Sequence, residues 1–273
     1  MGGERLLITG TTGFLGRAIL ERLRAARPAW AADCEVLSPS RAAEPRCNLD
    51  DPDRLSHYVR ELAPDRILHV AAESRMGACE QDPEGAMRRN AESTAALAEV
   101  GARILFVSTD LVFDGRSAPY RPADPVSPLS AYGASKAQGE SAVVAGGGLV
   151  VRLPLLFGRS FDGRRGATDM LRAASEECRA LSLFSNEFRT PLHIADAADR
   201  LLEAIASGRT GFEHCGGPER VSRSELATRF LGLHPIALEF QEVENRDASR
   251  PADVSLTTEV GCERSLDEML RDA

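Results

Sequence analysis

The sequence predicts an α/β fold: a doubly wound parallel sheet with a smaller C-terminal lobe. In the first half of the chain, short apolar segments rich in β-branched residues alternate with segments of helical periodicity. Parallel strands need crossover helices, so this alternation favours a sheet covered by helices on both faces. Beyond residue 158 the alternation weakens, which predicts a separate lobe interleaved with the last strands of the sheet.

Each element follows from local pattern. Strands are expected at 5–10, 34–38, 66–72, 102–109 and 148–158, and helices at 14–26, 51–62, 83–101 and 132–143. Asp51 before Pro52 indicates a helix start, since aspartate caps and proline fits the first turn. In the second half, helical patterns at 166–180, 196–207 and 222–232 mix with short apolar runs such as 191–194.

The composition excludes several classes of function. The 273 residues are 43% hydrophobic and 27% charged, as in an ordinary globular protein. A net charge of −8 argues against nucleic-acid binding. No apolar run reaches the roughly 20 residues that span a bilayer, and the N-terminus lacks the pattern of a secretory signal. The six cysteines and five histidines show no metal-ligand spacing, so we expect no metal site and a cytoplasmic protein.

A glycine-rich turn joins the first strand to the first helix. Gly10, Gly13 and Gly16 recur at three-residue spacing in LLITGTTGFLG. Such glycines let the backbone approach a pyrophosphate, which the helix N–H groups then bind. A turn that merely ends a strand is the alternative, but the strand–turn–helix context favours dinucleotide binding. We therefore interpret residues 1–158 as a Rossmann-like dinucleotide-binding domain and 159–273 as a substrate-binding lobe.

The end of the second strand bears on the choice of dinucleotide. An acidic residue there would bind the ribose hydroxyl of NAD. The segment contains Ser40 and Arg41 and no acid, so NADPH is favoured, with NADH remaining open. The alternative for Arg41 is an exposed loop arginine.

Tyr132 and Lys136 are four residues apart in the segment SAYGASKAQGE. Residues at this spacing lie on one face of a helix, and the spacing alone favours an ordinary surface pair. The remaining motifs of the chain decide between these readings.

Taken together, the motifs resemble the extended short-chain dehydrogenases/reductases, closest to the dTDP-4-dehydrorhamnose reductase branch of nucleotide-sugar reductases. The resemblance covers nearly the whole chain. Its segments are TTGFLG (11–16), CNLDDP (47–52), HVAAESRMGACEQDPEGAMRRN (69–90), VSTDLVFDG (107–115), YGASK (132–136), FRTPLHIAD (188–196), GFEHCGGPERVSRSEL (211–226) and RPADVSL (250–256).

The resemblance implies an NAD(P)-dependent oxidoreductase that reduces a carbonyl group. It implies Tyr132 as proton donor, Lys136 as the group that lowers the pKa of the phenol and anchors the cofactor ribose, and Thr109 as hydrogen-bond partner of the carbonyl. We expect neither Tyr132 nor Lys136 to be a core residue. The cofactor-binding residues that it implies are Gly10, Thr12, Gly13, Phe14, Leu15, Gly16, Ser40, Arg41, Asn48, Leu49, Ala71, Ala72, Tyr132, Lys136 and Pro154.

The substrate-binding residues that it implies are Glu73, Asp110, Arg189 and Arg250. Alternatives stay open for three of them. Glu73 could form a solvated loop pair with Arg75, and Arg189 and Arg250 could hold a diphosphate or form structural ion pairs. His193 follows an apolar pair and is expected to be a packing residue.

Departures from the family bear on the substrate. Leu111 stands where the related dehydratases carry a catalytic glutamate, so dehydration is not expected. The reductases have a tyrosine at that position, and Leu111 and Glu73 depart from their pocket. The expected substrate is a nucleotide-linked 4-keto-6-deoxy sugar. Alternatives are a non-catalytic NADP-binding regulatory subunit, like a relative that serves methionine adenosyltransferase, and an NAD-dependent sugar epimerase. A homodimer is compatible with the sequence.

Overall fold

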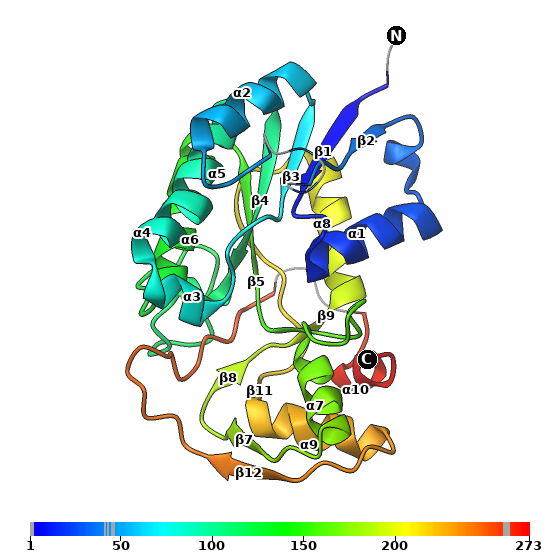
Figure 1. Cartoon of the computed structure of the whole chain (residues 1–273), viewed down its shortest axis with the longest axis vertical. Coiled ribbons are helices and arrows are strands. Elements are labelled where there is room, and N and C mark those ends of the chain that lie inside the picture. Colours follow the sequence, from blue (N-terminus) through cyan, green and yellow to red (C-terminus); the bar gives the residue numbers. More distant parts are fainter. Residues whose placement is uncertain (1–2, 41, 43, 45–46, 259–262) are drawn as a thin grey trace.

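The structure is a computed structural model of the chain and describes residues 3–40, 42, 44, 47–258 and 263–273. Within these residues, a six-stranded sheet forms the centre of the molecule, in the order β10-β5-β4-β3-β1-β2, with every neighbouring pair parallel (Figure 1). Its strands are β1 (Arg5–Thr9), β2 (Glu35–Leu37), β3 (Arg66–His69), β4 (Arg103–Thr109), β5 (Leu149–Leu153) and β10 (Gly211–His214). The predicted doubly wound α/β class is confirmed.

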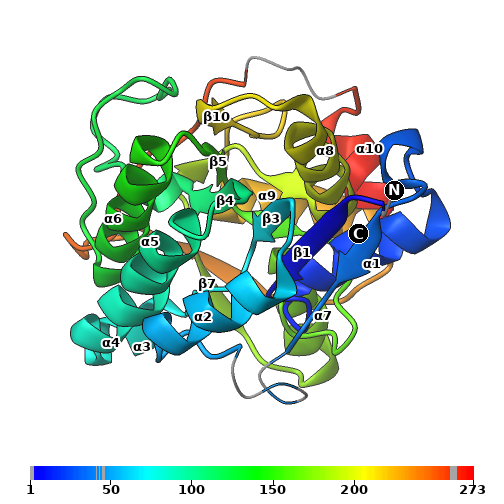
Figure 2. The same ribbon diagram turned by 90° about the horizontal axis from the view of Figure 1, so that it is seen from above.

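Helices cover both faces of this sheet, as Figure 2 shows from above. On one face lie α1 (Phe14–Ala25) and α8 (Ile194–Ser207), and on the other α2 (Pro52–Leu62), α5 (Ser93–Ala98) and α6 (Ala131–Ala145). Each face has its own apolar cluster. Ile19 of α1 joins the first cluster, and Leu55 of α2 joins the second. Full burial of each such side chain stabilises the fold by roughly 1.5–3 kcal/mol.

The start of α2 agrees with the sequence prediction. The Asp51 side chain accepts a hydrogen bond from the backbone N–H of Arg54 at 3.1 Å, and Pro52 is the first helical residue. The helix ends at Ala63, which adopts φ 43° in the left-handed region.

The prediction of a single regular helix at 83–101 is wrong. The segment is α4 (Pro83–Met87), a π-helical turn at Arg88–Glu92, and α5, preceded by a short α3 (Met76–Gln81). The Thr94 hydroxyl donates to the carbonyl of Asn90 at 2.6 Å, and the Ser93 hydroxyl donates to the carbonyl of Arg89. Side chains that bond to the preceding turn in this way compete with the regular helical pattern.

The strand expected at 148–158 is also interrupted. β5 ends at Leu153, and a separate β6 (Leu156–Phe157) pairs with β9 (Leu192–His193) outside the central sheet. Pro154 lies at the break, because proline has no N–H to donate to a ladder.

The second half of the chain contributes both to the central sheet with its covering helices and to a separate lobe. β10 and α8 belong to the central sheet and its cover. The remainder forms a lobe in the lower part of Figure 1. Its elements are α7 (Ala167–Glu176), β7 (Leu181–Phe184), β8 (Phe188–Arg189), β11 (Val221–Ser222), α9 (Arg223–Leu233), β12 (Phe240–Val243) and α10 (Leu266–Arg271).

Two further findings concern the described part of the chain. None of its helices has the length and apolar character needed to cross a membrane. It also contains no group of three or more His, Cys, Asp or Glu side chains arranged to hold a metal ion.

Candidate active site

The glycine loop between β1 and α1 packs closely on the segment after β3. Gly10 has φ +73°, and a Cβ at this position would lie 2.7 Å from the backbone nitrogen of Ala71. A Cβ at Gly16 would collide with the backbone of Gly10. A Cβ at Gly13 would meet only the Gly10 carbonyl, at 3.2 Å. Gly10 and Gly16 are therefore required by backbone packing, while the space outside Gly13 stays open.

The N-terminus of α1 has the properties of an anion site. Gly13 is the N-cap, no side chain caps the helix, and its first turn contains no acidic residue. Uncapped N–H groups and the positive end of the helix dipole favour a bound anion. Thr12 is exposed beside this turn, and Phe14, Leu15 and Gly16 form its start. The loop thus fits the pyrophosphate of a dinucleotide.

The buried side chain of His69 connects the strand ends next to the glycine loop. His69 ends β3, and its Nδ1 lies 2.8 Å from the Thr9 hydroxyl, which accepts hydrogen bonds from the N–H groups of Val70 and Ala71. Its Nε2 lies 3.1 Å from the Thr94 hydroxyl. Burial lowers the pKa of His69 to about 3, so the ring is neutral. The ends of β1 and β3 are thereby tied together under the predicted cofactor residues Ala71 and Ala72.

The other predicted cofactor residues lie at separate places. Asn48 and Leu49 precede α2, and the Asn48 side chain accepts a hydrogen bond from the N–H of Asp50 at 3.3 Å. Pro154 is buried at the end of β5. Ser40 lies in the segment after β2, and Arg41 lies outside the described residues.

The three predicted catalytic residues come from β4 and α6. Thr109 is the last residue of β4, and its hydroxyl donates to Oδ1 of Asp110 at 3.2 Å. Tyr132 lies in the first turn of α6, where the Ser130 side chain caps the helix by accepting from the N–H of Gly133. Lys136 follows one turn later. The chain therefore positions these residues with a strand end and a capped helix start.

The environment of Tyr132 keeps its phenol protonated. Burial raises the pKa of Tyr132 above its ordinary value, and the charge of Asp110 raises it further. A hydrogen bond with Thr109 acts in the opposite direction on this pKa. Thr109, Asp110 and Tyr132 are thus neighbours.

Lys136 corrects one expectation. It is 2% exposed, so the expectation that it lies outside the core was wrong. Its Nζ donates to the backbone carbonyl of Val107 at 2.7 Å and lies 3.8 Å from the centroid of the Phe106 ring. The ammonium is directed at the backbone of β4. Burial lowers the pKa of Lys136 itself to about 7, while the charge of Glu140 opposes the shift.

The four predicted substrate-binding residues all form ion pairs. Asp110 is buried, and its Oδ1 accepts from Arg189 at 2.8 Å. Arg250 binds Glu187 through two hydrogen bonds of 2.6 and 2.9 Å. Glu73 accepts from the Arg75 guanidinium at 3.0 and 2.9 Å, and this contact lowers the pKa of Glu73. The ion-pair alternative therefore describes Arg189 and Arg250 in this structure.

Sequence reasoning gave no role to two residues that the structure places near the site. Asn90, in the π-helical turn, binds the backbone N–H and carbonyl of Glu73 and donates to the Ser135 hydroxyl at 3.0 Å. Ser135 in turn donates to the carbonyl of Tyr132 at 2.8 Å. Arg223 is the first residue of α9, and its charge interacts with Arg189, Arg250, Glu187 and Asp110. A cation in a first helical turn is electrostatically unfavourable, and that signal could have identified Arg223.

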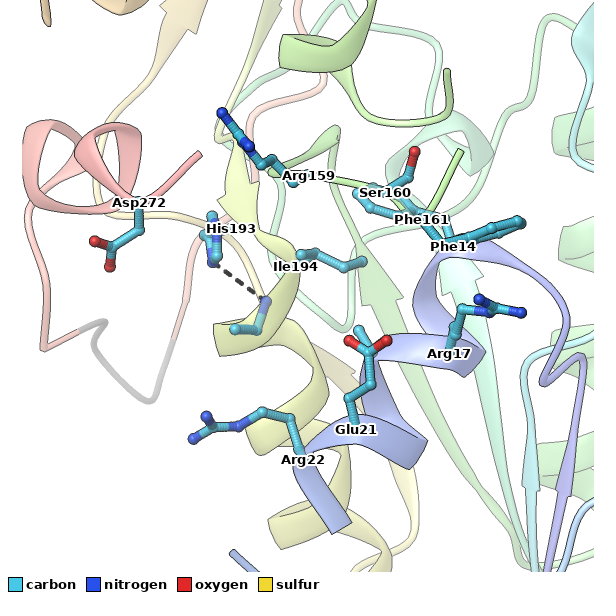
Figure 3. Close-up of a pocket in the computed structure, with 12 residues that line it drawn as sticks. Phe14, Arg17, Glu21, Arg22, Arg159, Ser160, Phe161, His193, Ile194 and Asp272 are labelled. Carbon is cyan, nitrogen blue, oxygen red and sulfur yellow. Dashed lines mark hydrogen bonds between the residues drawn. The ribbon is translucent and has the colours of Figure 1, made fainter. Parts of the chain in front are cut away.

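A cavity of about 220 Å³ lies beside the start of α1 (Figure 3). Phe14, Arg17, Arg159, Phe161 and His193 contribute to its wall. Of the predicted site residues it shares only Phe14. His193 is a packing and capping residue here, accepting from the N–H of Ala195 at 3.3 Å with its ring edge-on to Phe157.

Comparison with known proteins agrees with this geometry. The model of the RmlD substrate binding domain family matches residues 4–267. The chain belongs to this family.

Relatives of this RmlD-family protein have two different names. Methionine adenosyltransferase 2 subunit beta of Xenopus tropicalis is 38% identical over 236 residues, covering 82% of this chain and 70% of the relative. A dTDP-4-dehydrorhamnose reductase of Burkholderia thailandensis is 33% identical over 210 residues, covering 74% and 66%. Among solved structures, the dTDP-4-dehydrorhamnose reductase of Bacillus anthracis in complex with NADP has a TM-score of 0.85 at 22% identity, covering 98% of this chain and 96% of that one.

Proposed function

We propose that this RmlD-family protein is an NAD(P)H-dependent carbonyl reductase whose substrate is a nucleotide-linked 4-keto-6-deoxy sugar. One observation supports this most directly: the hydroxyls of Thr109 and Tyr132 are neighbours at the end of β4, with buried Lys136 one turn further along α6. This is the grouping that a carbonyl oxygen needs, namely a hydrogen-bond partner and a proton donor side by side. Similarity to dTDP-4-dehydrorhamnose reductases gives the substrate class.

The roles of the residues follow from their environments. The nicotinamide cofactor, when bound, supplies the hydride. Tyr132 gives its proton to the carbonyl oxygen, because a phenol is protonated at neutral pH and Thr109 lies beside it. Thr109 orients the same oxygen through its hydroxyl. Lys136 anchors the cofactor ribose. To do so, its Nζ would either give up its hydrogen bond to the Val107 carbonyl or bind the carbonyl and the ribose together.

NADPH is the proposed cofactor. The loop at Gly10–Gly16 and the uncapped start of α1 would hold the pyrophosphate. Residues 38–41 after β2 include Ser40 and Arg41 and no acid, which suits a 2′-phosphate. The Bacillus anthracis reductase with this fold is itself described in complex with NADP.

Reduction rather than dehydration is supported by the residues after Thr109. A dehydratase needs a second carboxylate next to the aspartate, and here Leu111 is buried and apolar. The Asp110 carboxylate is itself occupied by Arg189.

The decisive experiment is a single-turnover assay with the purified chain. NADPH and a panel of ketones, including dTDP-4-keto-6-deoxyglucose and free keto sugars, would be mixed with enzyme in excess. We expect loss of nicotinamide absorbance and a product two mass units heavier, for the nucleotide-linked ketone above all. NADPH consumption with none of these ketones would refute the reductase proposal.

A second candidate is a regulatory subunit, favoured by the relatives named methionine adenosyltransferase 2 subunit beta. It would keep the cofactor fold but act through a partner. Size-exclusion chromatography with the catalytic methionine adenosyltransferase of the same organism would show a shared peak in that case. An epimerase, by contrast, would retain its cofactor through purification, visible as nicotinamide absorbance.

A further inference from the structure

The cavity beside the start of α1 is bounded by four separate parts of the chain (Figure 3). Helix α1 forms one side, the segment after β6 a second and the start of α8 a third, and Asp272 completes the wall after α10. Its volume of about 220 Å³ lies below the roughly 300–1,000 Å³ of pockets that hold drug-sized ligands. None of the three predicted catalytic residues lines it. The cavity is therefore a separate place in the fold, and its size suits a small molecule.

One part of the wall is apolar. Ile194 is 5% exposed, and Ala18 is half-buried. The rings of Phe14 and Phe161 also belong to the wall. Phe161 is the most exposed large hydrophobic side chain among the described residues, at 49%. An apolar group of a ligand would remove this surface from water, which is favourable.

Two of the charged groups in the wall are already paired. Arg22 is bound to Asp199 by two hydrogen bonds of 2.7 Å, and Asp272 forms an ion pair with Arg264. These contacts join the elements around the cavity. The charges of Arg22 and Asp272 are therefore compensated within the chain.

Arg17 and Glu21 differ, because neither has a hydrogen-bond or ion-pair partner within the described part of the chain. They are four residues apart in α1 and lie on one face of it, where opposite charges commonly pair. The Arg17 guanidinium instead lies 3.9 Å from the centre of the Phe161 ring. In Figure 3 the Glu21 side chain extends from α1 toward Ile194. The contact with Phe161 thus keeps the two charges apart and leaves both in the cavity wall.

The signs of these charges decide the class of ligand. A simple anion would be attracted by Arg17 but repelled by Glu21. The reverse holds for a simple cation, which Arg159 in the same wall would also repel. A molecule with one carboxylate and one ammonium group would find an opposite charge for each. These two groups must be close together, because Arg17 and Glu21 are only about one helical turn apart. An α-amino acid meets both conditions.

We propose that the cavity is a binding site for an α-amino acid with an apolar side chain. Arg17 binds its carboxylate, Glu21 binds its ammonium group, and its side chain packs against Ile194 and the ring of Phe161. The predicted catalytic residues lie outside this wall, so the inference does not rest on the proposed reductase function.

The test is calorimetric titration of the purified, cofactor-free chain at neutral pH with L-phenylalanine and L-leucine. Three analogues each lack one of the recognised features. Phenylethylamine lacks the carboxylate, 3-phenylpropanoate lacks the ammonium group, and glycine lacks the apolar side chain. We expect saturable binding of both amino acids, and binding of each analogue that is weaker than that of L-phenylalanine by about 10-fold or more.

Variants identify the residues that bind the two charged groups. Glu21→Gln and Arg17→Gln should each weaken L-phenylalanine binding by about 10–100-fold, since hydrogen bonds to charged groups contribute on this scale. Arg24→Gln is the matched control, because Arg24 is exposed on the same helix and does not line the cavity. It should bind L-phenylalanine within about twofold of wild type. All three side chains are exposed, so the variants should unfold at the wild-type temperature, which circular dichroism would measure.

Three results would overturn the inference. The first is the absence of saturable binding of either amino acid at millimolar concentrations. The second is binding of 3-phenylpropanoate as tight as that of L-phenylalanine, which would show that Glu21 binds no ammonium group. The third is an equal loss of affinity in Arg24→Gln and in the two cavity variants. None of these results bears on the reductase proposal, because the titration requires neither NADPH nor turnover.

Discussion

Arg152 of β5 and Glu140 of α6 form a two-fold hydrogen-bonded ion pair in the core, with N–O distances of 2.9 and 2.8 Å. Both side chains are 2% exposed. The guanidinium also donates to the carbonyl of Pro122 and lies over the rings of Phe113 and Phe212. The pair fixes α6 against the sheet one turn after Lys136, and so it positions the helix that bears Tyr132.

Glu140→Gln should therefore destabilise the protein strongly. The substitution leaves the Arg152 charge buried without compensation, which typically costs about 3–5 kcal/mol. Urea unfolding at pH 7.5 would measure the loss. Arg179→Gln, which breaks the exposed pair with Glu177, is the control and should cost less than about 1 kcal/mol. Similar losses in both variants would contradict the structural role assigned to the buried pair.

Lys136 should make stability depend on pH. Its pKa is about 7 in the folded chain and about 10.4 when unfolded. Between these values the unfolded chain binds the additional proton, so the free energy of unfolding rises with pH by up to about 1.4 kcal/mol per unit. Below pH 7 this contribution is constant. Lys136→Met removes this pH-dependent contribution. The free energy of unfolding of the variant should therefore exceed that of cofactor-free wild type by an amount that shrinks from pH 7 to 9.5. Parallel curves would show that Lys136 titrates normally.

Tyr132→Phe should abolish proton delivery while preserving the ring. We expect single-turnover reduction to slow by about 10²–10⁴-fold, the usual contribution of a positioned general acid. NADPH affinity should change little, since the glycine loop and Lys136 are untouched. Lys136→Met should lower both the rate and NADPH affinity. A normal reduction rate in Tyr132→Phe would refute the role of Tyr132 as the proton donor.

Arg41 offers a test of cofactor choice. We expect NADPH to bind more tightly than NADH, because residues 38–41 after β2 contain no acid to bind an unphosphorylated ribose. Arg41→Ala should reduce the difference between the two affinities, because it weakens the binding of NADPH alone. Fluorescence titration with each cofactor would measure it, with Arg246→Gln as a charge-matched control. Equal affinities in the wild type would refute the selectivity prediction.

Much of the fold could be predicted because its signals are local. The Asp51–Pro52 start of α2 depends on capping, and the loop at Gly10–Gly16 depends on backbone conformation, so both are readable from a few residues. The alternation of strands and helices likewise predicted the parallel sheet.

The errors arose where distant residues decide the outcome. Lys136 was expected outside the core because lysine is rarely buried, yet the Val107 carbonyl and Phe106 ring hold its ammonium there. The pairing of Arg189 with Asp110 joins residues 79 positions apart. No sequence pattern records such pairings.

The contact between Asp110 and Arg189 also limits how this protein can be re-engineered. Grafting a lobe from a relative with another sugar preference is an obvious route to new specificity. A graft that begins after β6 would remove β10 from the edge of the sheet, and it would also remove Arg189. Asp110, which directly follows Thr109, would then lose its guanidinium partner. A chimaera would therefore have to take the edge strand, the arginine and the carboxylate that pairs with it from the same relative. Point substitution in the pocket is the more practical route to a new specificity.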